Sequence, residues 1–599
     1  MKIFLLWHRE TELGRTLDPY SVASSLQKIF APLFSTPLRA LIRQNAVAAM
    51  VFVELPVKGW RPAFFQEDER TWAFCGDYPI NARSVLSANN RRFRENDVLP
   101  TLGRSLEDDP GPLLREMAPP FSLVWSSQRT GETCVQNDAL GQTQLFAYRD
   151  CRIWALTNKI AALKALGISP EPEPEQWAIR CTQGWFPLDM TGFKNTRFLG
   201  PSTRLRLDHG GVHESTYDVL SEWIHPESVS RDDCLELART SLLSQIREVM
   251  PLWERPSAGL SGGWDSRAVV SSLRIMDADF SVRVKGQPGK YDVALARELA
   301  RIAGLDLEVR GAYGLPPDQA EDLRRCISRA LRWQTGYMWS EEHKSFLWEK
   351  GHLDGGVVNV MGQHGEIGRG VYEGKLKATG IDEDTYEDRL VAFLTKDVST
   401  LLRKELLTRI GEIIRYAFRQ SDQYDLGGPA RLDFFHLFER TRRYNSASVS
   451  AQTGLVFSPF LNPDYIRATC AYRAGGGAFY ERGTELNPFH RHIIAWNAPE
   501  WMNVPYERDL RRREKKKRRT RSVTPCTPRN AVSSEWRRAQ GKDYYDYATY
   551  WQMVGKPIID EALAKDGLWT EIFDPDLARA GWATAADEIA MLHLIPQAL

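Results

Sequence analysis

The 599-residue chain has only eight cysteines, and no two of them form a C-x-x-C pair. Zinc sites and disulfide scaffolds depend on closely spaced cysteines, so the sequence predicts neither. Scattered cysteines are typical of a reducing compartment, and we therefore expect a cytoplasmic protein.

Long apolar segments are also missing. The longest, residues 45–57, is interrupted by Glu54 and Pro56 and is too short to cross a bilayer. The apolar run at residues 3–7 is too short for a signal peptide. We expect no membrane span and interpret 45–57 as a buried strand.

Net charge is nearly absent, at +1, so the overall charge favours no particular partner. The exception is residues 508–521, where ten of fourteen side chains are basic. Such a block is usually a solvated loop, although it could bind an acidic partner or nucleic acid. Because no basic–aromatic stacking motif accompanies it, we expect no nucleic-acid partner.

The pattern of apolar residues changes near residue 220. Residues 1–220 contain short strands and tight turns, among them a turn at 137–141. From residue 228 onward, helices alternate with strands, beginning with a helix that Ser230 and Asp233 would cap. The sequence thus predicts an α/β protein with two domains, 1–220 and 228–599, the second a doubly wound parallel sheet.

Residues 261–266 read Ser-Gly-Gly-Trp-Asp-Ser and carry the strongest functional signal. Adjacent glycines allow a close backbone approach to a ligand, and a helix that starts at once points its positive end at the same place. Asp265 is an oxygen ligand suited to Mg²⁺. The pattern lacks the lysine of a Walker A loop. It indicates a site for a magnesium pyrophosphate; the alternative is a glycine-rich turn before an ordinary helix.

A second metal ligand is predicted after the apolar run that starts at Val358. That run enters a glycine-rich turn, and Glu366 follows directly. If this strand lies beside the one that precedes Ser261, then Glu366 and Asp265 meet at one sheet edge. The alternative is a β-turn with a surface glutamate.

The hexapeptide resembles the S-G-G-x-D-S loop of ATP pyrophosphatases, which cleave ATP between the α and β phosphates. Further segments resemble asparagine synthetase B-type proteins: 292–296 fits their D-x-x-x-A helix, 457–462 their R-x-P-F-L-D motif, and 138–146 their R-D-x-x-G-x-x-P-L-Y turn. Aligning Gly362, Gly370 and Tyr372 with the family's later glycine-rich turn places Glu366 at its second metal ligand. The resemblance covers about residues 20–510.

This resemblance implies a degenerate Ntn-type glutaminase-like sandwich (αββα) followed by an ATP-pyrophosphatase domain. The family's glutaminase uses an N-terminal cysteine, but Lys2 stands at position 2 and the first cysteine is Cys75. We therefore expect no glutaminase activity. Relatives without it, namely β-lactam synthetase, carbapenam synthetase and the lasso peptide cyclases, close a ring with an internal amine.

The resemblance also implies the site residues, with ATP and Mg²⁺ as cofactors. The metal ligands are Asp265 and Glu366. The ATP-binding residues are Leu260, Ser261, Gly262, Gly263, Asp265, Ser266, Val284 and Gly362.

Three residues are candidates for the chemistry of the ring-closing step. Gln363 stands where the β-lactam enzymes have a catalytic tyrosine, so its neighbour His364 becomes a candidate base. The resemblance also places Glu439 near the family's acidic partner of that tyrosine, as a second candidate base, and Arg491 near the family lysine that steadies the reaction charge. The alternatives are a solvent-facing turn histidine, a helix-surface ion pair of Glu439 with Arg442 or Arg443, and a helix-surface cation.

Six large apolar side chains precede the second turn: Trp333, Tyr337, Met338, Trp339, Phe346 and Trp348. They would form either ordinary core or a groove for a peptide. We expect a lasso peptide cyclase-like ligase that joins an Asp or Glu side chain of a precursor peptide to its N-terminal amine. Its partners would be that peptide and a leader peptidase and leader-recognition protein. The alternatives are a ligase acting on a small amino acid, a scaffold with a vestigial loop, and a tRNA-modifying pyrophosphatase.

Overall fold

A computed structural model describes most of the chain. The described residues are 2–127, 130–225, 229–286, 290–310, 319–335, 356–377, 382–396, 400–446, 454–481, 484–510 and 550–599. The expected α/β class is confirmed, with antiparallel sheets and a parallel sheet in the same chain.

Two six-stranded antiparallel sheets make up the N-terminal part of the described chain. One has the order β10-β8-β9-β1-β3-β2, and its strands are β1 (Lys2–His8), β2 (Ala40–Gln44), β3 (Ala48–Glu54), β8 (Phe146–Arg149), β9 (Trp154–Thr157) and β10 (Thr196–Phe198). The other has the order β12-β11-β7-β6-β5-β4, and its strands are β4 (Phe65–Glu67), β5 (Thr71–Cys75), β6 (Ser122–Ser127), β7 (Thr133–Asn137), β11 (Thr203–Asp208) and β12 (Gly211–Thr216).

Strand β1 shows how the layers arise. Successive side chains of a strand point to opposite faces. Phe4 and Leu6 belong to the core between the two sheets, whereas Ile3, Leu5 and Trp7 pack beneath the helices on the outer face. These outer helices are α1 (Pro19–Phe30), the 3-10 helix η3 (Ile160–Leu166) and α5 (Pro174–Gln183). On the other sheet, α2 (Ala82–Ala88), α3 (Val98–Asp108) and α4 (Pro110–Glu116) form the outer layer.

The parallel sheet has the order β15-β14-β13-β16-β17. Its strands are β13 (Ser257–Gly259), β14 (Ser281–Lys285), β15 (Leu307–Arg310), β16 (Val357–Val360) and β17 (Gly454–Phe457). The chain starts in the middle, runs outward to β15 and returns to the other side of β13. The strand order therefore reverses between β13 and β16, and ligands of open parallel sheets bind at such a reversal, outside the carboxyl ends of the strands.

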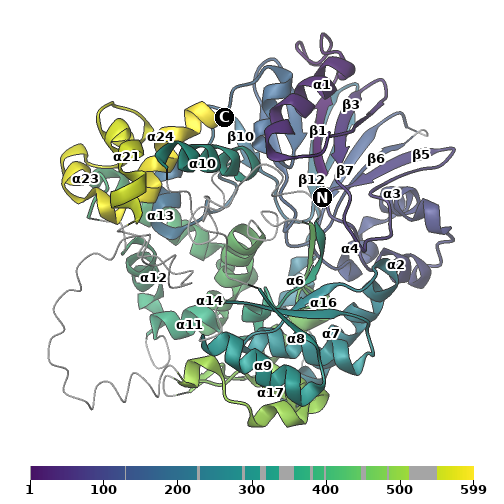
Figure 1. Ribbon diagram of the computed structural model, residues 1–599. Coiled ribbons are helices and arrows are strands. Elements are labelled where there is room, and N and C mark those ends of the chain that lie inside the picture. The colour runs from purple at the N-terminus through teal and green to yellow at the C-terminus, as the bar shows by residue number, and fades with distance from the viewer. Residues whose placement is uncertain are drawn as a thin grey trace.

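Helices cover this sheet and extend beyond it. Those that pack against the sheet or one another are α7 (Arg231–Val249), α8 (Trp264–Ile275), α9 (Tyr291–Ala303), α16 (Pro463–Ala474) and α17 (Pro488–Asn497). Helix α7 begins as predicted, because the Ser230 hydroxyl accepts the Asp233 N–H. Figure 1 shows this part below the antiparallel sheets.

The remaining α-helices of the described ranges do not form one group, since the first of them packs against α16 and most of the others share a different apolar core. They are α6 (Leu220–Ile224), α10 (Ala320–Gln334), α11 (Val371–Leu376), α12 (Tyr386–Thr395), α13 (Lys404–Arg419), α14 (Pro429–Phe435), α21 (Lys556–Leu563), α22 (Leu568–Ile572), α23 (Pro575–Gly581) and α24 (Ala586–Ala598). Helices α10 and α24 pack together, at the upper left of Figure 1, and share an apolar core with α1. Within the described ranges, we find no helix with the length and apolar character that crossing a membrane requires.

Candidate functional site

The site predicted from the glycine loop lies where the strand order reverses. Strands β13 and β16 pair in parallel, with Ala258 opposite Val360. The condition for the second metal ligand, that these two strands lie side by side, is therefore met. The loop at residues 261–266 and the turn at residues 361–366 leave the sheet at the same edge.

Hydrogen bonds within the glycine loop hold it in a compact shape. The Ser261 N–H donates to Ser266 Oγ over 3.0 Å, and the Gly263 N–H donates to Ser261 Oγ over 3.2 Å. The Gly262 N–H donates to Asp292 Oδ1 over 2.8 Å, which ties the loop to α9. Helix α8 starts directly after Gly263 with no side-chain cap, so the partial positive charge of its first turn lies at this edge.

Glycines allow the second turn to lie directly against Asp265. A Cβ atom added to Gly362 would lie 2.8 Å from Asp265 Cβ, and one added to Gly365 would lie 2.5 Å from Asp265 Oδ1. Real Cβ atoms do not approach other atoms so closely, so any larger residue would push the two turns apart. Gly362 and Gly365 therefore allow the turn that follows β16 to contact Asp265.

Asp265 has two basic partners that the sequence did not reveal. Arg369 Nη1 lies 2.9 Å from Asp265 Oδ2, and His490 Nε2 lies 2.8 Å from Asp265 Oδ1. Arg369 also pairs with the buried Glu485 over 2.7 Å. Burial alone would raise the pKa of Asp265, but the charge of Arg369 and the contact with His490 hold it below its usual value.

Glu366 is a second carboxylate in the same neighbourhood. Burial raises its pKa, and so does the negative charge of Asp265. Asn445 Nδ2 donates to Glu366 Oε2 over 3.1 Å. The two carboxylates therefore interact electrostatically, as the second-ligand prediction requires.

The donor set fits one hard divalent cation that also has substrate ligands. Mg²⁺ is often held by one or two carboxylates together with phosphate oxygens. Within the described part of the chain, no group of three or more His, Cys, Asp and Glu side chains is arranged to hold a metal by itself. Asp265 and Glu366 would thus be the protein ligands of a cation at this site. The cation would compete with Arg369 for the Asp265 carboxylate.

A later segment covers the glycine loop. The buried Arg267 donates to the carbonyl oxygens of Val504 and Pro505 over 2.8 and 2.6 Å. Tyr506 stacks on Trp264, with 3.4 Å between ring centroids. The segment at residues 504–507 is therefore part of the loop's surroundings, a role that its sequence did not indicate.

Arg491 is exposed, as a helix-surface cation would be, and lies beside the glycine loop. Its guanidinium carbon is 4.9 Å from the Trp264 ring centroid, and its Nε donates to the Leu486 carbonyl. The residue of α17 that contacts Asp265 is its neighbour His490.

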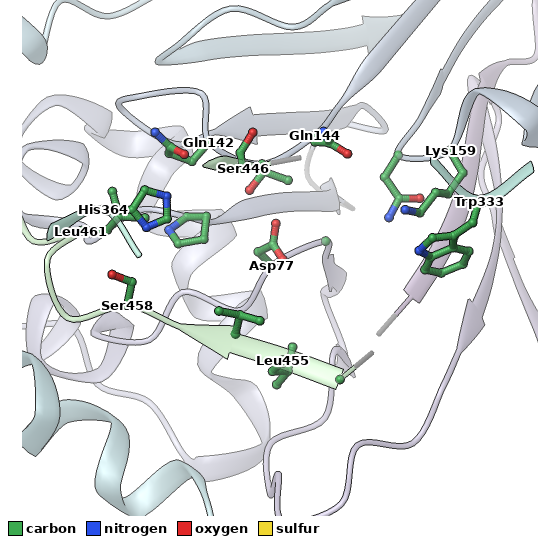
Figure 2. Close-up of a pocket in the computed structure, with 16 residues that line it drawn as sticks. Asp77, Gln142, Gln144, Lys159, Trp333, His364, Ser446, Leu455, Ser458 and Leu461 are labelled. Carbon is green, nitrogen blue, oxygen red and sulfur yellow. The ribbon is translucent and has the colours of Figure 1, made fainter. Parts of the chain in front are cut away.

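His364 differs from the solvent-facing alternative. It is 1% exposed, adopts a left-handed conformation with φ 70°, and lines a cavity of about 100 Å³ between the two parts of the chain. Burial lowers its pKa to about 3, so the ring stays neutral near pH 7 and is a weak base. Figure 2 shows His364 at one end of this cavity, close to Leu461 and Ser458.

The other end of the cavity holds a buried lysine. Lys159 Nζ lies 3.9 Å from the ring centroid of Trp333, and burial lowers the pKa of Lys159 to about 7 (Figure 2). Gln142 and Thr143 also line the cavity, and they have side-chain polar atoms with no hydrogen-bond partner among the described residues. Buried polar atoms of this kind usually meet water or a ligand.

Glu439 is not on a helix surface. It lies in the π-helix η9 (His436–Asn445), is 1% exposed, and accepts the Leu188 N–H over 3.0 Å with Oε2. Burial raises its pKa, against the opposing charges of Arg443 and Arg442. This hydrogen bond joins Glu439 to the N-terminal part of the chain and not to Asp265.

Other predicted residues lie in the core or outside the described ranges. Leu260 and Val284, predicted to bind ATP, have side chains in the apolar core around the parallel sheet. Trp333 packs against Phe30 and Phe34, as ordinary core does. Residues 337–348 of the aromatic segment and 511–521 of the basic block lie outside the described residues.

Comparisons with known proteins add little to this geometry. No protein-family model and no curated protein sequence matches the chain. The structure of glutamine phosphoribosylpyrophosphate (PRPP) amidotransferase from B. subtilis, complexed with ADP and GMP, is 13% identical over 52% of this chain and 65% of that one, with a TM-score of 0.25. A structure of an allosteric regulatory enzyme of purine biosynthesis is 12% identical over 53% of this chain and 82% of that one, also with a TM-score of 0.25. The match spans less than two thirds of the first structure, and similarity this low carries no functional argument.

Proposed function

We propose that the protein is an ATP-dependent ligase that forms an amide bond and releases AMP and pyrophosphate. The observation that supports this proposal is the electrostatic interaction of Asp265 and Glu366, on two turns that leave a parallel sheet at its reversal, next to a glycine loop and a helix N-terminus. Parallel sheets bind nucleotides in this position, and helix N-termini favour phosphate. The resemblance to asparagine synthetase B-type proteins points to cleavage between the α and β phosphates.

Five residues near the glycine loop have distinct roles in this proposal. Asp265 and Glu366 would hold Mg²⁺, which when bound offsets the charge of the pyrophosphate group. Arg369 and His490 fix the Asp265 carboxylate from two sides. Arg491, exposed beside the loop, is available for phosphate oxygens, which a guanidinium binds with two parallel hydrogen bonds.

The substrate that we propose first is a precursor peptide. A side-chain carboxylate of Asp or Glu attacks the α-phosphorus of ATP, and pyrophosphate leaves. The N-terminal amine of the same peptide then attacks the acyl carbon, AMP leaves, and the amine gives up a proton. The result is a macrolactam, as in lasso peptide cyclases. His364 is a poor acceptor for that proton, because burial lowers its pKa to about 3 and so disfavours the protonated ring. Glu439 accepts a hydrogen bond from the Leu188 N–H instead.

The size of the cavity at His364 favours a second candidate. A water occupies about 30 Å³ in the liquid, so a cavity of about 100 Å³ holds roughly three waters or one small molecule. This is the size of an amino acid and not of a peptide. A synthetase acting on a small amino acid is therefore the alternative.

The reaction class can be tested without knowing the substrate. The protein is incubated with ATP, Mg²⁺ and linear peptides that carry a free N-terminus and one Asp or Glu, and pyrophosphate, phosphate and peptide mass are measured. We expect pyrophosphate and AMP only with a carboxylate present, together with a peptide product lighter by one water. Activity with free aspartate and ammonia, but not with peptides, would select the second candidate. Release of phosphate and ADP would reject the proposal.

A further inference from the structure

The cavity in Figure 2 contains a buried lysine without an acidic partner. Lys159 is 5% exposed, and within the described part of the chain it forms no ion pair. Its ammonium lies against the Trp333 ring, which replaces only part of the water that the group loses on burial. A buried ammonium is unfavourable unless an anion joins it. The cavity therefore favours a ligand that brings a negatively charged group to Lys159.

A carboxylate lines the same cavity without pairing with this lysine. Asp77 is half-buried, and its charge favours the protonated form of Lys159 from a distance. Since the two side chains do not form an ion pair, each can face an opposite charge of its own. A bound anion without a positive group would leave Asp77 unpaired, and a bound cation without a negative group would leave Lys159 unpaired. A zwitterion matches both.

Other side chains of the wall offer neutral hydrogen-bonding atoms. Both amide atoms of Gln142, the Thr143 hydroxyl and both ring nitrogens of His364 lack a hydrogen-bond partner among the residues that the structure describes. All three side chains are buried. Because donors and acceptors are both present, a hydroxyl group, which donates and accepts, can satisfy them.

We infer that this cavity binds a small α-amino acid with a hydroxyl side chain, of the size of serine, in its zwitterionic form. The carboxylate lies beside Lys159, the ammonium group lies beside Asp77, and the hydroxyl meets the neutral polar atoms of the wall. A volume of about 100 Å³ holds one molecule of this size and excludes a large side chain.

The inference deepens the second candidate of the proposed function, and it rests on that proposal only for what happens to the bound amino acid. His364 lines the cavity and stands two residues before Glu366, so an occupant contacts the turn that carries a candidate metal ligand. Binding is measured without ATP. Absence of binding overturns the inference, whereas binding without pyrophosphate release on addition of ATP counts against the proposed function alone.

The test follows binding to the full-length protein by calorimetry, with L-serine as the probe. Ethanolamine lacks its carboxylate, and 3-hydroxypropionate lacks its ammonium group. We expect serine to bind at least about tenfold more tightly than either, because each loses one desolvated charge pair. L-Alanine, which lacks the hydroxyl, should bind about fivefold more weakly than serine, and L-phenylalanine should not bind.

Binding should also be linked to proton uptake. Burial lowers the pKa of Lys159 to about 7, against the charge of Asp77. A bound carboxylate stabilises the charged ammonium, so serine should take up about one proton per site at pH 8 and almost none at pH 5.5. The uptake is measured from binding heats in buffers that differ in ionisation enthalpy. Asp77 and His364 are the other titratable side chains that line the cavity.

Two variants assign the charged groups. Lys159→Met replaces the unpaired ammonium with an apolar side chain of similar length, so it should fold. It should lower serine affinity about tenfold, abolish proton uptake and leave ethanolamine binding unchanged. Asp77→Asn should weaken serine and ethanolamine but not 3-hydroxypropionate.

The matched control is Lys164→Met, at an exposed position of the same helix η3, which should change none of these values. Equal affinities for serine and ethanolamine, no serine binding at millimolar concentration, or unchanged serine affinity in Lys159→Met would overturn the inference.

Discussion

Asp265 and Arg369 form an ion pair across two neighbouring turns of the parallel sheet, with 2.9 Å between Oδ2 and Nη1. They are 104 residues apart in sequence. The Arg369 guanidinium thus occupies part of the space around the carboxylate that a metal ion would bind. A divalent cation at this site would be repelled by Arg369 and would compete with it for Asp265.

The first prediction concerns Asp265 itself. Asp265→Asn keeps the shape of the side chain but removes the charge that would hold Mg²⁺. We expect pyrophosphate release to fall by at least about a hundredfold, since a ligand of the metal or of the developing charge is lost. Asp306→Asn, which neutralises an exposed carboxylate on the way to β15, should leave the rate unchanged. Wild-type rates in Asp265→Asn would contradict the assignment of this site.

The second prediction concerns Arg369. Arg369→Met leaves Asp265, Glu366 and Glu485 without a shared cation. Because Arg369 is 21% and Asp265 25% exposed, solvent screens part of the loss, and we expect destabilisation of about 2 kcal/mol near neutral pH. Arg301→Met removes an exposed ion pair on α9 and should cost much less.

The pH dependence of this effect has a definite sign. The folded pKa of Asp265 lies below its ordinary value, so its contribution to stability is present above that ordinary pKa and is lost as the pH falls through the folded one. Without Arg369, His490 alone opposes the effect of burial on Asp265, so this contribution shrinks, and the carboxylates repel one another when ionised. The difference in melting temperature between wild type and Arg369→Met should therefore be largest near pH 7 and shrink toward about pH 4. Millimolar Mg²⁺ should raise the melting temperature of the variant more than that of wild type. Equal melting curves at both pH values would contradict the role of Arg369.

Local signals in the sequence were enough to predict the framework of the site. Two glycines with a following helix marked the loop, and alternating strands and helices predicted a parallel sheet. That β13 and β16 are neighbours in this sheet was only a condition of the second-ligand prediction, and the structure meets it. The partners of Asp265 could not be found in this way. His490 and Arg369 reach it through tertiary packing, and neither has a spacing that marks it.

The charge pattern around Glu439 does not reveal that this residue is buried. A stretch containing Glu439, Arg440, Arg442 and Arg443 reads as a solvated helix face. In the structure this stretch is a π-helix packed against the N-terminal part, and its charges offset one another in the interior. Only the tertiary fold distinguishes the two cases.

The third prediction concerns His364. A pKa of about 3 means that its ring does not titrate between about pH 6 and pH 8, so it contributes no inflection to a pH–rate profile there. His364→Asn tolerates the left-handed backbone, because asparagine adopts that conformation readily. We expect the pH profile of pyrophosphate release to keep its shape in this variant, as it should in His213→Asn, which changes an exposed histidine. An inflection near pH 6.5 that disappears only in His364→Asn would show that His364 is the base after all.

The fourth prediction separates a structural from a catalytic Glu439. Its folded pKa is raised by burial, so its ionisation lowers stability as the pH rises above the ordinary value for glutamate. Glu439→Gln can still accept the Leu188 N–H and removes this ionisation. Relative to wild type, the variant should therefore gain stability between about pH 4 and pH 7, measured by thermal unfolding. Glu412→Gln, at an exposed ion pair, should show no such trend.

The rate of amide formation by Glu439→Gln separates the two roles. If Glu439 is structural, this rate stays within about threefold of wild type, since no interaction with the reacting atoms is lost. A hundredfold loss of rate at unchanged stability would instead make Glu439 the general base that its sequence position suggested.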